Sequence, residues 1–130
     1  MIILDTHIWI WNVQGDTRLS KAHLDLIREH ENDEIGISAI SLWEVAKAVE
    51  LKRLNFSIPI EDWFSIALNQ PGIVVLPLTS RIAVESTNLP GNFHKDPFDQ
   101  LIVATARIFD VPLITVDSEI VNYPHVKLLP

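Results

Sequence analysis

The chain has 130 residues, 48% of them hydrophobic, with no cysteine and a formal net charge of −7. This length fits a single domain, residues 1–130, whose apolar content is enough for a core without disulfides or thiolate-bound metal. No apolar run approaches the roughly 20 residues that span a bilayer, and no charged-then-apolar leader follows Met1, so we expect a cytoplasmic protein rather than a membrane protein.

The first half of the chain alternates short strands with helices. Residues 1–4 are a continuous apolar run typical of a buried strand, and residues 5–13 continue as an amphipathic helix. Ser20 is a predicted N-cap for a second helix, after which residues 35–38 form a second strand. Ser41 is predicted to begin a third helix, and Pro59 to lie near the start of a fourth.

The second half repeats this alternation. Residues 73–78 are predicted as a strand, followed by a short helix over 80–87, and Asp96 precedes a longer helix with Pro97 at its first position. Residues 113–116 form the next predicted strand and residues 125–129 an edge strand. Parallel strands need crossover connections, and helices supply them, so the pattern predicts a three-layer α/β fold with helices on both faces of a parallel sheet.

Five carboxylates stand where a predicted strand ends or a predicted helix begins. They are Asp5, Glu44, Asp96, Asp99 and Asp117. If the strands over 1–4 and 113–116 are parallel neighbours, Asp5 and Asp117 both emerge at the carboxyl edge of the sheet, where open α/β sheets bind ligands. Like charges gathered there are unstable unless cations fill the site, and oxygen-only ligands suit magnesium or manganese. The sequence therefore predicts a divalent metal site.

Most of these acids also have an ordinary structural alternative. Glu44 closes a Ser41-x-x-Glu44 pattern, the signature of a capping box, and Asp96 before Pro97 is a common N-cap. Asp99 in a first turn gains from the helix dipole, and Asp117 could begin a short helix. Asp5 is the hardest to explain structurally, because a carboxylate directly after a buried strand is costly unless it is solvated, paired or metal-bound.

Metal-assisted hydrolysis is the chemistry that an all-carboxylate site can support. One ion can orient and deprotonate a water while another stabilises the leaving oxygen of a phosphodiester. The net charge of −7 argues against a polyanionic substrate, but metal loading offsets part of it, and local basic residues then matter more. Those that could contact a nucleic-acid backbone, with solvated helix faces as the alternative, are Lys47, Lys52, Arg53, Lys95 and Arg107.

Four segments resemble, in the same order, the four motifs of PIN domains. They are Ile2-Ile3-Leu4-Asp5-Thr6-His7, Ile37-Ser38-x-x-Ser41-x-Trp43-Glu44, His94-Lys95-Asp96-Pro97-Phe98-Asp99-Gln100-Leu101-Ile102-Val103-Ala104-Thr105-Ala106 and Leu113-Ile114-Thr115-Val116-Asp117. The likeness is greatest to the VapC-type toxins of bacterial toxin–antitoxin modules, single PIN domains of about this size. Their His-Arg-Asp-Pro-Phe-Asp-Arg motif is matched here with Lys95 and Gln100 in place of the two arginines.

The resemblance implies a Rossmann-like parallel sheet and a metal-dependent endoribonuclease. Carried over by position, the acidic quartet that would hold Mg²⁺ or Mn²⁺ is Asp5, Glu44, Asp99 and Asp117. Asp5 and Asp99 would bind the ion directly, so that its water attacks RNA and leaves a 3′ hydroxyl and a 5′ phosphate. Asp96 is an additional acid that would ligate a second metal, orient water or only cap its helix.

Two hydroxyl residues complete the expected site. Thr115 resembles the hydroxyl residue often found beside the last acid of the family and would bond to a carboxylate or a water, and Thr6 is a weaker example of the same kind. The five histidines show no metal-ligand spacing, so His7 and His94 are expected to be surface or hydrogen-bonding residues rather than ligands.

The resemblance also implies partners. The substrate would be RNA, such as transfer or ribosomal RNA, and the inhibitor a small DNA-binding, VapB-like antitoxin whose basic side chain enters the acidic crevice. We expect a homodimer, and we place dimer or antitoxin contacts on residues 41–69, including Trp43 and Trp63. The tryptophans could instead stack on bases, although helical positions favour packing for Trp9, Trp11, Trp43 and Trp63.

Two other functions compete with the nuclease. A phospho-accepting receiver domain is also a parallel α/β protein with an acidic magnesium pocket, but it needs an acceptor aspartate after the third strand, and Leu76-Pro77-Leu78-Thr79 offers none. A non-catalytic PIN binding module is the other alternative, which the complete acidic quartet disfavours.

Overall fold

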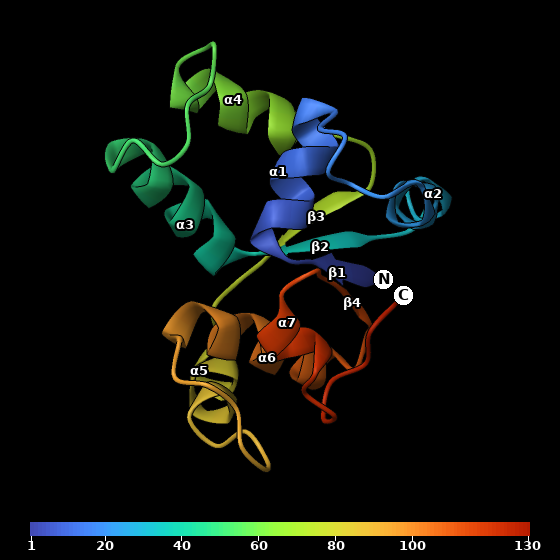
Figure 1. Cartoon of the computed structure of the whole chain (residues 1–130), viewed down its shortest axis with the longest axis vertical. Coiled ribbons are helices and arrows are strands. Elements are labelled where there is room, and N and C mark those ends of the chain that lie inside the picture. Colours follow the sequence, from blue (N-terminus) through green and yellow to red (C-terminus); the bar gives the residue numbers. More distant parts are fainter.

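A sheet of four parallel strands in the order β3-β2-β1-β4 forms the middle of the molecule (Figure 1). The computed structural model describes all residues from 1 to 130. The strands are β1 (Ile2–Leu4), β2 (Ile35–Ser38), β3 (Ile73–Leu76) and β4 (Leu113–Ile114). The helices are α1 (Thr6–Gln14), α2 (Lys21–Glu29), α3 (Ala39–Glu50), α4 (Ile60–Ala67), α5 (Ser80–Ser86), α6 (Pro97–Phe109) and α7 (Ser118–Val121). The predicted three-layer α/β fold is confirmed.

Side-chain alternation along the strands divides the core into two apolar clusters. In β1, Ile2 and Leu4 pack with α1, α2, α3 and α4, whereas Ile3 between them packs with α6 and α7. This follows from the two-residue period of a strand, which sends neighbouring side chains to opposite faces. Figure 1 shows the result, with α1 and α4 on one side of the sheet and α5, α6 and α7 on the other.

The strand order places a topological switch between β1 and β4. From β1 the chain moves through β2 to β3, and α5 and α6 then return it to β4 on the other side of β1. Ile3 pairs with Leu113 and Leu4 with Ile114, so these two strands end side by side. The crevice beyond the carboxyl ends of strands at such a switch is where doubly wound sheets bind ligands. The fold therefore brings Asp5 and Asp117 to one place.

The third helix begins earlier than the sequence suggests. Ser38, the last residue of β2, is the N-cap, and its hydroxyl accepts a hydrogen bond from the Ile40 amide at 3.2 Å. The strand therefore passes directly into α3, and Ser41 lies inside the helix with no exposed surface. The predicted capping box of Ser41 and Glu44 is wrong, which removes the structural explanation for Glu44.

The strands near the C-terminus are shorter than predicted. β4 stops at Ile114, and the Thr115 hydroxyl that follows it bonds to the Asp5 carboxylate and the Asp117 amide. The predicted edge strand over 125–129 is not formed. One parallel bridge between Leu113 and Leu128 stands in its place, beside the two-residue β4. No helix of the structure has the length and apolar character to cross a membrane.

Candidate active site

Asp5 is fixed at the floor of the crevice. It follows β1 directly, is only 7% exposed, and caps α1 by accepting the Thr6 amide on Oδ1 at 2.8 Å. Its other oxygen, Oδ2, accepts the Thr115 hydroxyl at 2.7 Å. Both carboxylate oxygens are thus held from opposite sides, which orients the group without neutralising it.

Thr115 connects the two strand ends. While its hydroxyl donates to Asp5, the same oxygen accepts the backbone amide of Asp117 at 3.0 Å. Asp117 in turn caps α7, with Oδ1 accepting the amides of Glu119 at 2.9 Å and Ile120 at 3.4 Å. The hydroxyl predicted to bond to a carboxylate does so, and it ties the position of Asp117 to that of Asp5.

A second hydroxyl chain holds Glu44. The Thr6 hydroxyl donates to Glu44 Oε1 at 2.8 Å and lies 2.7 Å from the Ser41 hydroxyl. Because the single Thr6 hydrogen goes to the carboxylate, Ser41 is the donor to Thr6. Ser41 was interpreted as a helix cap from the sequence, and its place in this chain was missed. Only the tertiary contact between α1 and α3 reveals it.

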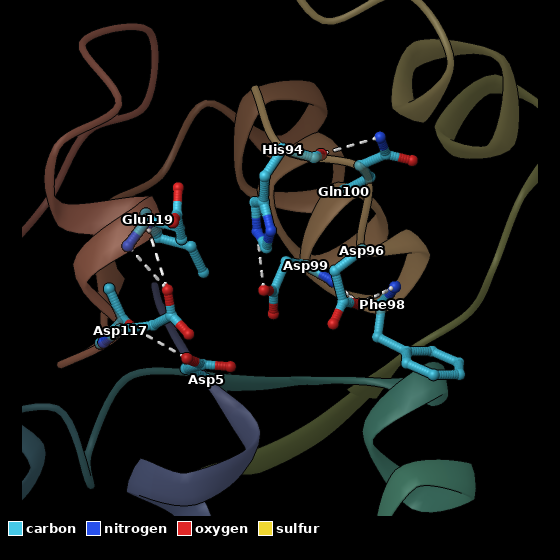
Figure 2. A network of polar contacts seen from close by, with 10 residues as sticks. Asp5, His94, Asp96, Phe98, Asp99, Gln100, Asp117 and Glu119 are labelled. Carbon is cyan, nitrogen blue, oxygen red and sulfur yellow. Dashed lines mark hydrogen bonds and ion pairs between the residues drawn. The ribbon is translucent and has the colours of Figure 1, made fainter. Parts of the chain in front are cut away.

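The start of α6 presents two more acids to the same space. Asp96 is the N-cap, with Oδ1 accepting the amides of Phe98 at 2.9 Å and Asp99 at 3.3 Å. Figure 2 shows the carboxylates of Asp5, Asp99 and Asp117 turned toward a common space from three different elements. The capping role predicted for Asp96 as the alternative to catalysis is therefore real, and it uses only one of the two carboxylate oxygens.

His94 lies against Asp99. Its Nε2 is 2.9 Å from Asp99 Oδ2, but the ring nitrogen is not aligned for a hydrogen bond, so the contact is electrostatic (Figure 2). The Gln100 side chain holds the loop that carries His94, since its amide nitrogen Nε2 donates to the His94 backbone carbonyl at 3.0 Å. Gln100, which replaces an arginine of the family motif, thus has a structural partner here.

Burial and the neighbouring carboxylates together raise the pKa values of three of these acids. Burial raises the pKa of Glu44 to about 7, with the charges of Asp5, Asp99 and Asp96 adding to the rise and the Thr6 hydroxyl opposing it. Burial also raises the pKa of Asp99 to about 6, reinforced by Asp96, Asp117 and Asp5 and opposed by His94. Burial raises the pKa of Asp5 as well, against the hydrogen bonds from Thr115 and Thr6.

This donor set fits a divalent cation. Carboxylate oxygens are the ligands that magnesium and manganese prefer, and a cation would offset both the burial of these charges and their mutual repulsion. In their present positions no three Asp, Glu or His side chains approach closely enough to hold one ion together. Three of these side chains would therefore have to move closer together to bind one ion.

The tryptophans divide into core and surface residues. Trp9 has no exposed surface and Trp63 is only 2% exposed, with its indole NH donating to the Gln14 side chain at 3.0 Å. The proposal that Trp63 forms part of an exposed contact surface is wrong, because aromatic packing against Trp9, Phe56 and Phe64 buries it. Trp43, in contrast, is 48% exposed.

The basic residues also separate into two groups. Arg107 is bound to the Glu85 carboxylate at 2.9 Å and the His125 carbonyl at 2.6 Å, so it acts within the fold. Lys47 and Arg53 line a cavity of about 450 Å³ that reaches the acidic residues Glu44 and Asp96. Arg18 also lines this cavity, and its sequence context gave no signal for that position.

Comparisons with known proteins identify the family to which the chain belongs. The PIN domain family matches residues 2–126. Ribonuclease VapC22 from Mycobacterium tuberculosis (strain ATCC 25618 / H37Rv) is 32% identical over 124 residues, which cover 95% of this chain and 92% of the relative. Two similar structures are VapBC2 from Rickettsia felis bound to a promoter DNA fragment and a toxin–antitoxin complex from Klebsiella pneumoniae.

The structural likeness extends over nearly the whole chain. The Rickettsia structure has a TM-score of 0.73 at 17% identity and covers 99% of this chain and 98% of its own. The Klebsiella structure has a TM-score of 0.67 at 21% identity and covers 100% and 97%. Identities this low support the fold alone.

The fold and the acidic crevice define a PIN-type nuclease domain. The chain belongs to the PIN domain family, and its predicted likeness to the VapC type is confirmed by the ribonuclease relative. Nucleases of this kind generally depend on divalent metal ions. The receiver-domain alternative is thereby set aside.

Proposed function

We propose that this protein is a Mg²⁺- or Mn²⁺-dependent endoribonuclease and the toxin component of a type II toxin–antitoxin system. The observation that carries the proposal is the convergence of Asp5, Glu44 and Asp99, from three separate elements, with pKa values raised by burial and in part by the charge of neighbouring carboxylates. A cluster that repels itself is stable only with a cation or with protons, and a nuclease centre needs the cation.

Each acid has a distinct role in this proposal. Asp5 and Asp99 hold the ion, while Glu44 and Asp117 complete or orient its surroundings. Asp5 serves as the fixed ligand because both its oxygens are already oriented by hydrogen bonds. Asp99 is the ligand free to reorient, since its carboxylate accepts no hydrogen bond and its one ion-pair contact is with His94. When bound, the ion supplies charge neutralisation at the phosphate and a water of lowered pKa.

Thr115, Thr6 and Asp96 support this centre. Thr115 orients Asp5 and opposes the rise in its pKa that burial causes, because a hydrogen bond donated to a carboxylate favours its charged form. Thr6 does the same for Glu44. Asp96 is placed to orient water or a second ion with Oδ2, the oxygen that its helix cap leaves unused.

The experiment is cleavage of a mixed pool of transfer and ribosomal RNA by purified protein. We expect cutting with Mg²⁺ or Mn²⁺, none with EDTA, and none by the Asp99→Asn variant. The products should carry 5′ phosphates. Cutting by Asp99→Asn at the parental rate would remove Asp99 from the site, and the absence of cutting by the parent with any metal would favour the non-catalytic binding module.

We further propose a VapB-like antitoxin as partner, which inserts a basic side chain among the acids, and a homodimer as the toxin's own assembly. The similar structures from Rickettsia and Klebsiella are antitoxin complexes, which supports the first. With Trp63 buried, the exposed apolar side chains of the 41–69 segment that remain for such contacts are Trp43, Leu51, Ile58 and Ile66. An Ile66→Asp variant that still dimerises and still binds its antitoxin would exclude the α4 face.

A further inference from the structure

We infer that the cavity between α1, α3 and the loop after α3 holds the RNA strand flanking the scissile phosphate, with Trp43 as a stacking platform for a base and Arg53 and Lys47 as phosphate contacts. This inference rests on the proposed nuclease function and names the surface that would position its substrate. Sequence reasoning identified Lys47 and Arg53 as scattered charges, whereas the fold gathers them.

The cavity is continuous with the acidic crevice. Thr6, Glu44 and Asp96 line its inner side, and all three belong to the centre described above. An RNA whose phosphate lies at these acids must continue across a neighbouring surface, because its flanking nucleotides are covalently attached. The cavity of about 450 Å³ is a recess of nucleotide scale at this position.

Trp43 has the features of a base-stacking residue. It is 48% exposed, and its ring stacks on Phe98 with centroids 5.1 Å apart and planes 28° apart. Phe98 lies between Asp96 and Asp99 at the start of α6, so the platform is anchored to the same turn that presents the acids. One face of the Trp43 indole is therefore supported and the residue remains half open to a ligand. Bases stack on such aromatic rings with little dependence on sequence.

The charge distribution favours a polyanion at this one place. Three of the ten basic residues of a chain with net charge −7 line the cavity, and they are Arg18, Lys47 and Arg53. Arg18 is held by Asp16 through both carboxylate oxygens. Lys47 pairs with Glu50 on the exposed surface, where such an ion pair is weak and screened by salt. The Arg53 side chain forms no ion pair, so its charge is available. The Lys47 ammonium lies over the Trp43 ring, 5.7 Å from its centre, so a base that stacks on that face would displace the ammonium toward its phosphate.

The test measures RNA binding and small-substrate hydrolysis separately. Trp43→Leu keeps an apolar contact for Phe98 but loses the aromatic face, and Arg53→Gln removes one charge. Arg28→Gln is the matched control, because Arg28 is exposed on α2 and lies outside the cavity. Binding of a labelled single-stranded oligoribonucleotide is followed by anisotropy at several salt concentrations in an Asp99→Asn background, and hydrolysis of bis(p-nitrophenyl) phosphate is followed with Asp99 intact. Thermal melting checks that each variant is folded.

We expect Trp43→Leu to weaken RNA binding by about tenfold or more, since one stacked base is lost. Arg53→Gln should lower the slope of binding against salt by about one, because one phosphate contact is lost. Neither should change hydrolysis of the small diester, which has no flanking nucleotide. RNA binding equal to that of Arg28→Gln in both variants would overturn the inference and leave the cavity to a protein partner. An equal fall in small-diester hydrolysis would also overturn it, because Trp43 would then only support the acids.

The failure of the nuclease proposal would look different. A parent protein that hydrolyses neither RNA nor the small diester, but whose Asp99→Asn form binds RNA in a manner that depends on Trp43 and Arg53, would refute the catalytic function and keep the RNA surface. A parent that hydrolyses the small diester, while the Trp43 and Arg53 variants bind RNA normally, would keep the catalytic function and refute the RNA surface.

Discussion

The two sides of the acidic crevice are built in opposite ways. On the β1–β4 side, Asp5 is buried and both its oxygens are hydrogen-bonded, with Thr115 connecting it to Asp117. On the α3–α6 side, Glu44 and Asp99 are half-buried, and burial together with repulsion from neighbouring acids raises their pKa values to about 7 and about 6. The first side fixes the position of a ligand, and the second side carries the raised pKa values that a bound cation would lower. Changes on the two sides should therefore have different signatures.

The largest effect should come from the fixed side. Asp5→Asn replaces a buried carboxylate by a neutral amide of the same shape, so we expect RNA cleavage to fall by at least about 100-fold, in the range found for removing one essential electrostatic group. Cleavage and metal affinity should fall together while the far-UV circular dichroism stays unchanged. Undiminished RNA cleavage by this variant would remove Asp5 from the centre.

A smaller loss should follow when the connection between the strand ends is cut. Thr115→Val keeps the shape of the side chain but removes the hydroxyl, which leaves buried Asp5 Oδ2 without its donor and the Asp117 amide without its acceptor. We expect metal affinity or activity to fall by about 10- to 100-fold, as for other groups that orient a ligand, with an unfolding free energy lower by about 1–3 kcal/mol. Thr115→Ser should restore both, and a serine variant as impaired as valine would show that the methyl group matters instead.

Glu44 and Asp99, on the α3–α6 side, should make the free energy of unfolding depend on pH. With EDTA present, the folded protein holds protons on Asp99 and Glu44 at pH values where the unfolded chain has released them, because both folded pKa values are raised. Stability should therefore fall as the pH rises from about 4 to about 7, since the folded state binds more protons in that window.

The Glu44→Gln variant isolates this effect. Because glutamine carries no charge to repel, we expect it to flatten the fall and to melt roughly 2–5 °C above the parent at pH 8 in EDTA. At pH 4, where the parent glutamate is protonated, the two proteins should melt together. A higher melting temperature for Glu44→Gln at both pH values would point to packing rather than charge.

The smallest effect belongs to His94. Its contact with Asp99 is electrostatic and partly exposed, so His94→Gln should change the melting temperature in EDTA by no more than about 2 °C. The same substitution should leave Asp99 freer to move toward a bound ion. Metal affinity measured by titration calorimetry is therefore expected to stay equal or increase, and a loss of affinity would make His94 part of the site.

Features of the fold and the site that depend on residues close together in the sequence could be predicted, whereas contacts between distant segments could not. The fold and the placement of Asp5 and Asp117 followed from apolar runs and helix signals, because parallel strands bring their carboxyl ends to one edge. The capping roles of Asp96 and Asp117 were likewise local and were confirmed.

Contacts between segments far apart in the sequence could not be predicted from local patterns. Ser41 fitted a capping box, and only the packing of α1 against α3 shows that it serves Thr6 and Glu44 instead. Trp63 lay on a helix stripe that could face outward or inward, and three aromatic neighbours decide that it is buried. The gathering of Arg18, Lys47 and Arg53 around one cavity likewise depends on the fold.

The most direct test of the central claim is an NMR titration of the Glu44 and Asp99 carboxyl carbons with and without Mg²⁺. Without the ion, both groups should titrate well above ordinary carboxylates, near 7 and near 6. With saturating Mg²⁺, both pKa values should fall below about 5, because the ion favours the charged form. Values that are equally high with and without Mg²⁺ would contradict the claim that these acids form a cation site.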